Sequence, residues 1–129
     1  PLKVVLWAAS SAVDTDWTAK LVDVHPCGYA RNLADGIVRA RFRHGTSQAE
    51  LLKPGAVEEY VIELGPTSNV FLAGHRIRLE ISSSNFPHYD RNPNTGRAAT
   101  SEEDMVPATQ TIYHDARHPS HILLPIIPA

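Results

Sequence analysis

The chain has 129 residues and a formal net charge of −2, from 12 Lys and Arg against 14 Asp and Glu. One domain with a single core is expected at this length, and a near-neutral charge without a basic run argues against nucleic-acid and membrane partners. The sequence has no apolar run of about 18 residues and no signal peptide, so we expect a soluble, cytoplasmic protein.

The first predicted strand lies at the start of the chain. Residues 2–7 form an apolar run, and Val4, Leu6 and Ala8 fall on one face of an extended segment. No initiating Met precedes the strand, so we expect a segment cut from a longer polypeptide. We expect the whole of 1–129 to form a single domain.

A loop, a second strand and a turn are predicted next. Residues 10–16 are polar and predict a loop, whereas 17–25 predict a mostly buried strand. The turn lies at 26–28, because Pro fixes φ and Gly permits a positive φ there. Its residue Cys27 is the only cysteine, which excludes an internal disulfide, and we expect it to lie exposed in the turn without a role.

A third strand is predicted over 32–43, where apolar and basic residues alternate with a period of two. Arg39, Arg41 and Arg43 then share one strand face. Such a stripe could bind phosphate, but we interpret it as the solvated outer face of a sheet. We predict that the three arginines are exposed to solvent.

The second half of the chain also consists of strands and turns. A polar loop with one short helical segment at 48–52 leads to a turn at 54–55 and a strand over 57–64. Charged and apolar residues alternate over 76–81, which predicts a half-buried strand. Irregular sequence follows over 82–106, a length that is usually functional or disordered.

Two final strands are predicted at 109–113 and 121–125. The chain thus has seven or eight strands and no amphipathic helix. This spacing predicts an all-β fold, an antiparallel β-sandwich or jelly roll.

Seven histidines raise the question of a metal site. His114, His118 and His121 are spaced by four and three residues and would share one face of a helix. Pro119 and the β-rich flanks argue against a helix, so the spacing loses its geometric meaning. We predict that these histidines belong to a turn, with no metal and no cofactor. A metal-dependent β-sandwich enzyme built on them is the last of the alternatives.

We predict no catalytic residue in the chain. The nucleophile pattern G-x-S-x-G is absent, and so are a P-loop, a G-x-G-x-x-G element and a C-x-x-C pair. The serines at 82–84 are candidates by residue type alone.

The loop over 85–96 is the candidate functional site. It concentrates Asn, Asp and Pro, whose side chains fix local turns through hydrogen bonds to the backbone. Its two aromatic residues would be available to anchor a partner surface. A structural knot, an interdomain surface and a ligand site all remain open for this loop. The candidate residues are Asn85, Phe86, Tyr89, Asp90, Arg91, Asn92 and Asn94.

Several motifs resemble one known family, in the order expected for it. They are DTDWTAKLVDV at 14–24, NLADG at 32–36, SSSNFP at 82–87 with DRN and NTG shortly after, and YHD with HPSH near the end. Together they resemble the C-terminal, non-catalytic domain of the X-prolyl dipeptidyl-peptidase, cocaine esterase and α-amino-acid ester hydrolase family. The resemblance covers nearly the whole chain and implies a jelly-roll β-sandwich of the galactose-binding-like type.

This resemblance implies an accessory role. In that family the catalytic Ser, Asp and His belong to a preceding α/β-hydrolase domain, so no triad residue transfers to this chain. The chain would pack on and support such a domain of the same polypeptide, in a serine hydrolase that cleaves esters or amides such as acyl esters or X-Pro peptides. An incomplete sandwich would expose a sheet edge through which copies of the chain could form a homo-oligomer.

A departure from the family pattern and an alternative function bear on this expectation. Cys27 stands where the family commonly has an acidic residue before the turn glycine, so this turn carries no family role. The alternative function, from fold analogy alone, is a stand-alone carbohydrate or small-ligand binding module that uses the loop over 85–96.

Overall fold

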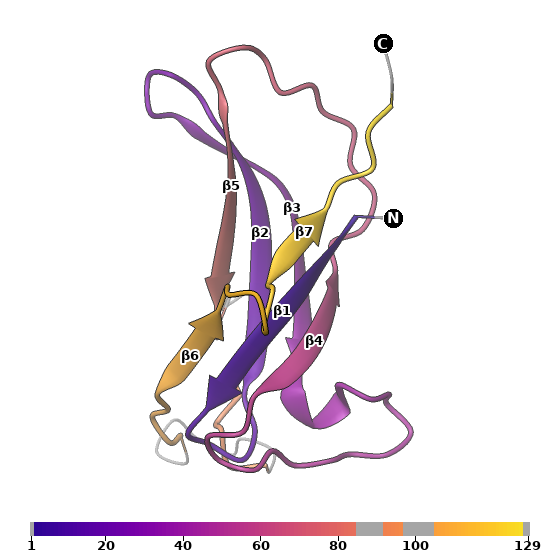
Figure 1. The fold of residues 1–129 in the computed structure, drawn as a ribbon, viewed down its shortest axis with the longest axis vertical. Coiled ribbons are helices and arrows are strands. Elements are labelled where there is room, and N and C mark those ends of the chain that lie inside the picture. The colour runs from indigo at the N-terminus through magenta and orange to yellow at the C-terminus, as the bar shows by residue number, and fades with distance from the viewer. Residues whose placement is uncertain (1, 85–91, 97–104, 128–129) are drawn as a thin grey trace.

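The computed structural model describes residues 2–84, 92–96 and 105–127. Its elements are β1 (Lys3–Ser10), β2 (Asp16–Val24), β3 (Ala30–Arg39), the short 3-10 helix η1 (Ala40–Phe42), β4 (Glu58–Glu63), β5 (Arg76–Ser82), β6 (Gln110–Tyr113) and β7 (His121–Leu123). The strands form two antiparallel sheets, and the strands of one cross those of the other obliquely (Figure 1).

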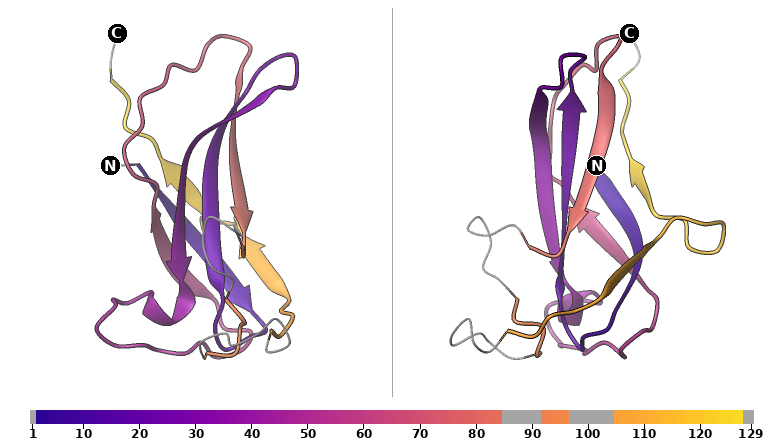
Figure 2. Two further views of the ribbon diagram at one scale, coloured as in Figure 1. Left: turned by 180° about the vertical axis from the view of Figure 1, so that it is seen from behind. Right: turned by 90° about the vertical axis from the view of Figure 1, so that its left-hand side faces the viewer.

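The first sheet is centred on β1. β4 pairs with one edge of β1, and β6 and β7 pair in succession along the other. The second sheet has the order β3-β2-β5. The two sheets lie in separate layers (Figure 2), so the predicted all-β sandwich is confirmed.

The core lies between the two sheets and follows from the period of two in the strands. Alternate residues of a strand point to the same face, so β1 and β4 contribute mainly every second side chain to the core. The Trp17 and Tyr60 rings come from opposite sheets, with centroids 6.0 Å apart. The buried apolar side chains around them include Val4, Leu6, Ala19, Leu21, Ile62 and Leu64.

Two of the predicted elements are wrong in detail. The strand expected over 32–43 ends at Arg39, and η1 turns the chain away from the sheet. Residues 48–52 form no helix, since their backbone hydrogen bonds run to residues elsewhere in the chain. One of these bonds joins the Leu52 amide to the Val13 carbonyl at 2.7 Å.

The half-buried strand predicted over 76–81 is β5, but one of its apolar residues is not covered. Leu79 and Ile81 pack against the core, whereas Ile77 is 52% exposed. In the register with β2, Ile77 lies opposite Asp23, close to the end of the ladder.

The two sheets come into close contact at Gly36. A Cβ atom at this position would overlap the backbone carbonyl oxygen of Glu63 in β4 and lie 3.1 Å from Ile62 Cγ2. Only a residue without a side chain fits between β3 and β4 at this point. This contact joins β3 and β4, which are edge strands of the two sheets.

Most chain connections gather at two ends of the sandwich, whereas the β6–β7 connection lies between these ends (Figure 1). The β1–β2 loop, η1 and residues 92–96 lie at one end. The β2–β3 turn and the segment that leads into β5 lie at the other. In the part of the chain that the structure describes, no helix has the length and apolar character needed to span a bilayer.

Candidate functional site

Two buried aspartates lie at the end of the sandwich that carries the β1–β2 loop. Asp14 and Asp16 are 0% and 1% exposed. Because a buried carboxylate needs compensating partners, the groups around them decide what this end of the fold can do. Arg39 donates to Asp16 through Nε at 2.8 Å and through Nη2 at 3.0 Å, a bidentate pair.

The second aspartate has a similar arginine partner. Arg41 donates to Asp14 through its backbone N–H at 2.9 Å and through Nη1 at 3.0 Å. The β2–β3 register explains the first pair, because Asp16 lies opposite Arg39 at the end of the ladder. Asp14 and Arg41 lie just beyond that end, Asp14 in the β1–β2 loop and Arg41 in η1.

An asparagine from the candidate loop completes this cluster. Asn92 Nδ2 donates to Asp14 Oδ2 at 3.0 Å and to Asp16 Oδ1 at 2.9 Å. Its own Oδ1 accepts the backbone N–H of Asn94 at 2.9 Å. We call Asp14, Asp16, Arg39, Arg41 and Asn92 the carboxylate network. It ties three distant parts of the chain together.

Asn94 continues the anchoring of this segment. Its φ is 66°, in the left-handed region that asparagine tolerates better than most residues. Its Nδ2 donates to the Val106 carbonyl at 2.8 Å, and the Val106 amide donates to the Pro93 carbonyl at 2.8 Å. Two stretches on either side of 97–104 are therefore joined to each other.

The structure describes two of the seven residues predicted for the candidate site. Asn92 is buried, and its carboxamide makes hydrogen bonds within the chain through both its nitrogen and its oxygen. Asn94 is partly exposed. The other five, Asn85, Phe86, Tyr89, Asp90 and Arg91, lie outside the described residues.

The prediction of a solvated arginine stripe is wrong. Arg39 and Arg41 are ion-paired to buried aspartates, and the side chain of Arg43 is only 3% exposed. Arg43 Nη1 donates to the carbonyls of Ala40 and Glu50 at 2.9 and 2.6 Å. Basic and apolar residues alternate with a period of two whether the basic face of the strand is exposed or meets acids inside the fold. The sequence pattern therefore could not distinguish the two environments.

The three histidines considered for a metal site lie near the β6–β7 connection. The His118 ring contacts Trp7 and Tyr113, with centroids 5.5 and 5.0 Å away. His114 forms a β-bridge with Pro119, whose carbonyl is paired with His121 Nδ1. Among the described residues, these three histidines do not form a group of converging metal ligands.

A different set of metal-ligating side chains was missed. Asp23, His25 and His75 lie at the end with the β2–β3 turn, and one ligand atom of each lies within 4.8 Å of the others. His75 Nδ1 is 2.8 Å from Asp23 Oδ1. Burial alone would raise the pKa of the Asp23 carboxyl, but hydrogen bonds from His75 and Asn69, together with the charges of His75 and His25, outweigh it and hold the pKa below its usual value.

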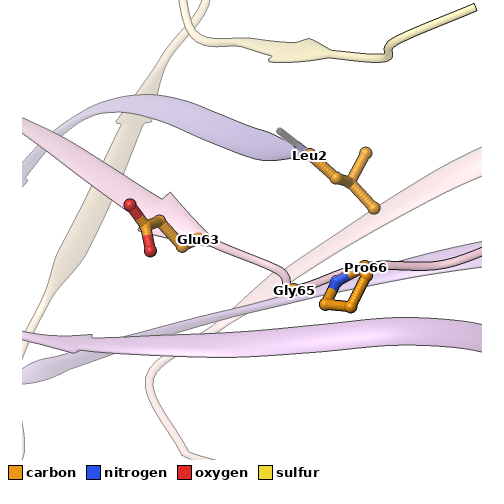
Figure 3. A pocket seen from close by; sticks show the side chains of 4 residues that line it. All are labelled: Leu2, Glu63, Gly65 and Pro66. Carbon is orange, nitrogen blue, oxygen red and sulfur yellow. The ribbon is translucent and has the colours of Figure 1, made fainter.

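One shallow pocket lies where the chain leaves β4 near the start of β1. It is lined by Leu2, Glu63, Gly65 and Pro66 (Figure 3). Its lining offers one carboxylate and no nucleophile or imidazole, so it is not a candidate catalytic site.

Comparisons with known proteins found similarity in sequence and in structure. The family model described as "X-Pro dipeptidyl-peptidase C-terminal non-catalytic domain" matches residues 1–123. A cocaine esterase of Rhodococcus sp. (strain MB1 Bresler) is 54% identical over 124 residues, which are 95% of this chain and 22% of that protein.

Two solved structures are also similar. An aminopeptidase from a marine sediment Thaumarchaeota archaeon matches 95% of this chain and 23% of its own, with a TM-score of 0.85 and 36% identity. An α-amino acid ester hydrolase matches 94% of this chain and 22% of its own, with a TM-score of 0.80 and 33% identity. The chain thus spans less than a quarter of the length of each protein.

Proposed function

From the premise that this chain belongs to the family of X-Pro dipeptidyl-peptidase C-terminal non-catalytic domains, we propose that it is the accessory domain of a serine hydrolase. It packs on and supports an α/β-hydrolase catalytic domain of the same polypeptide. The observation that carries this proposal is the match of almost the whole chain to only 22% of a cocaine esterase. The relative therefore has ample length for a catalytic domain.

The residues of the chain fit a non-catalytic role. The pattern G-x-S-x-G, which places a nucleophilic serine on a sharp strand-to-helix turn, is absent from the sequence. The buried charges of the carboxylate network are used to hold loops rather than presented at a cavity. Such an arrangement suits a rigid support.

We place the contact with the catalytic domain at the loop over 85–96. Support comes from the anchoring of residues 92–96, since Asn92 holds this segment on the β1–β2 loop. A loop held at its base can present its remaining residues to a partner at low entropic cost. In the full polypeptide, Phe86→Ala should loosen the docking of the two domains.

The proposal extends to substrate class, location and assembly. The parent enzyme would cleave esters or amides, in keeping with the names of the esterase, aminopeptidase and ester hydrolase relatives. A cytoplasmic location fits a chain with one cysteine and no internal disulfide. Association of copies through an open sheet edge is supported by β5, which pairs with β2 alone among the described strands.

The decisive experiment is to determine the coding sequence upstream of the Pro1 codon. We expect an in-frame region that encodes a hydrolase domain with G-x-S-x-G. A start codon or a short secretion signal directly upstream would contradict the proposal and favour a stand-alone binding module.

A second experiment tests the chain as it is. The purified 129-residue protein should not hydrolyse p-nitrophenyl esters or X-Pro anilides. Turnover that persists through purification and is abolished by a serine-directed inhibitor would overturn the assignment of a non-catalytic domain.

A further inference from the structure

We propose that Asp23, His25 and His75 form a binding site for one zinc ion. Imidazole nitrogen and carboxylate oxygen are ligands that zinc commonly takes in proteins. One ligand atom of each residue lies within 4.8 Å of the others, and no other such group of three occurs in the part of the chain that the structure describes. The site is separate from the carboxylate network and independent of the accessory role.

Strand register brings these residues together. Asp23 and His25 are two residues apart, so they lie on the same side of the extended chain at the end of β2. The last pair of the β2–β5 ladder is Val24 with Arg76, so the next positions outward are His25 and His75. Their imidazole rings are stacked at a tilt, with centroids 4.3 Å apart. The two histidines therefore face each other across neighbouring strands, with the carboxylate beside them.

An unpartnered nitrogen points to a missing ligand. His25 Nε2 is buried and has no hydrogen-bond partner in the part of the chain that the structure describes. Buried polar atoms nearly always have a partner, and one without needs an explanation such as an ion. A zinc ion held by His25 would supply that partner. Asp23 would bring the negative charge that offsets part of the charge of the ion.

The backbone around the site is already fixed. The His25 amide donates to the Tyr29 carbonyl at 2.8 Å, and the Gly28 amide donates to the His25 carbonyl at 2.9 Å, which closes the β2–β3 turn. The His75 amide donates to the Leu72 carbonyl at 3.0 Å. Little ordering of the main chain is needed to form the site.

The side chains need only a small adjustment. Zinc bonds to nitrogen and oxygen at about 2.0–2.2 Å, so the ligand atoms of a tetrahedral site lie about 3.5 Å apart. The 2.8 Å hydrogen bond between His75 Nδ1 and Asp23 Oδ1 is shorter than this, so these two atoms have to separate by roughly 0.7 Å and their shared proton is released to solvent when zinc binds. The third ligand, from His25, has to move by roughly 1 Å. Three protein ligands leave the fourth position to water or to a group from another part of the polypeptide.

The test is calorimetric titration of the metal-free chain, made without a polyhistidine tag, with zinc sulfate. We expect saturable binding of one equivalent and a higher Tm in the presence of zinc, whereas magnesium should produce neither. His25→Ala and His75→Ala should each weaken zinc binding by at least about tenfold, since even outer partners of metal ligands are worth about 10–100-fold.

The chain offers a matched control. His44 Nδ1 also lies 2.8 Å from a carboxylate, that of Glu50, but belongs to no group of three ligands among the described residues. His44→Ala should leave zinc affinity unchanged. Loss of affinity in His44→Ala equal to that in His25→Ala would overturn the proposal, because it would indicate adventitious binding to surface histidines.

A measurement on the unaltered protein keeps the test independent of variant folding. Titration with zinc should selectively shift the imidazole resonances of His25 and His75 in NMR spectra. Saturation of the protein with one equivalent of zinc while these two resonances stay unshifted would overturn the assignment, and so would the absence of saturable binding.

Discussion

The Asn92 carboxamide and the Asp14 carboxylate meet across 78 residues of sequence, with 3.0 Å between Nδ2 and Oδ2. Neither group is exposed to bulk water, and each satisfies the other's need for a partner. Asn92 is therefore a buried attachment point between residues 92–96 and the sandwich. This relationship makes Asn92 the most informative position in the candidate loop.

Replacing Asn92 should destabilise the fold. Asn92→Ala removes two hydrogen bonds to buried carboxylates and should lower the free energy of unfolding by about 2–4 kcal/mol. Asn32→Ala is the control, because the side chain is exposed on β3 and its loss should cost no more than about 0.5 kcal/mol. Urea unfolding monitored by circular dichroism measures both, and equal effects would contradict the role given to Asn92.

Arg41 should contribute far more to stability than an arginine in a surface pair. Arg41→Ala leaves the fully buried Asp14 carboxylate without its ion-pair partner, which should cost about 3–5 kcal/mol. Arg78→Ala breaks an exposed pair with Glu80 and should cost about 0–1 kcal/mol. Chemical denaturation distinguishes the two. An Arg41 variant as stable as the Arg78 variant would show that the buried pair is dispensable.

Gly36 should not tolerate a side chain. Gly36→Ala forces a Cβ atom against the Glu63 carbonyl, where backbone rather than a flexible side chain must move, so we expect a loss of at least about 3 kcal/mol. Gly28→Ala meets nothing within 4 Å but has a φ of +94°, so its cost should be about 1–2 kcal/mol. Thermal unfolding of both variants tests whether Gly36→Ala is the more destabilising. A larger loss of stability in Gly28→Ala would rule out close contact of β3 with β4.

Tyr60 should make the protein sensitive to alkaline pH. Burial raises the pKa of the Tyr60 phenol above its usual value of 10.0. The Tyr60 phenol therefore ionises at a lower pH in the unfolded chain than in the folded chain. Its contribution to the free energy of unfolding is complete below the usual pKa of 10.0 and is lost as pH rises through the folded-state pKa. Tyr60→Phe should flatten this loss.

Unfolding free energies measured by urea titration between neutral and alkaline pH provide the comparison. Tyr29→Phe, at a position 58% exposed, is the control and should retain the pH dependence of the unaltered chain. If Tyr60→Phe shows the same alkaline loss as the unaltered chain, another group is responsible for it.

Local patterns were sufficient to predict the strands and the family. Alternation of apolar and polar residues predicted β4 and β5 to within a few residues, because one face of each strand meets the core. The motifs running from Asp14 to Val24 and onward predicted the family, which the match over residues 1–123 confirms.

The carboxylate network could not be predicted in the same way. Arg39 and Arg41 alternate with apolar residues as exposed arginines would, and only the two aspartates at the same spacing in 14–16 hinted at a pairing. Recognising it required the β2–β3 register, which a period of two leaves undetermined.

The grouping of Asp23, His25 and His75 was even harder to predict from the sequence. His75 joins the other two only because β5 pairs with β2 across some fifty residues of chain. The spacing of residues in a motif carries information only about residues that are close in sequence. It therefore drew attention to the closely spaced His114, His118 and His121.

The position of β1 between β4 on one side and β6 and β7 on the other has a consequence during synthesis. The Trp7 amide donates to Ser120 Oγ, a residue 113 positions later. A ribosome that adds about 5–20 residues per second leaves that edge of β1 without its partner for several seconds. During this interval the apolar strand is open to pairing with other nascent chains, so chaperone binding to this segment would protect the yield of folded protein.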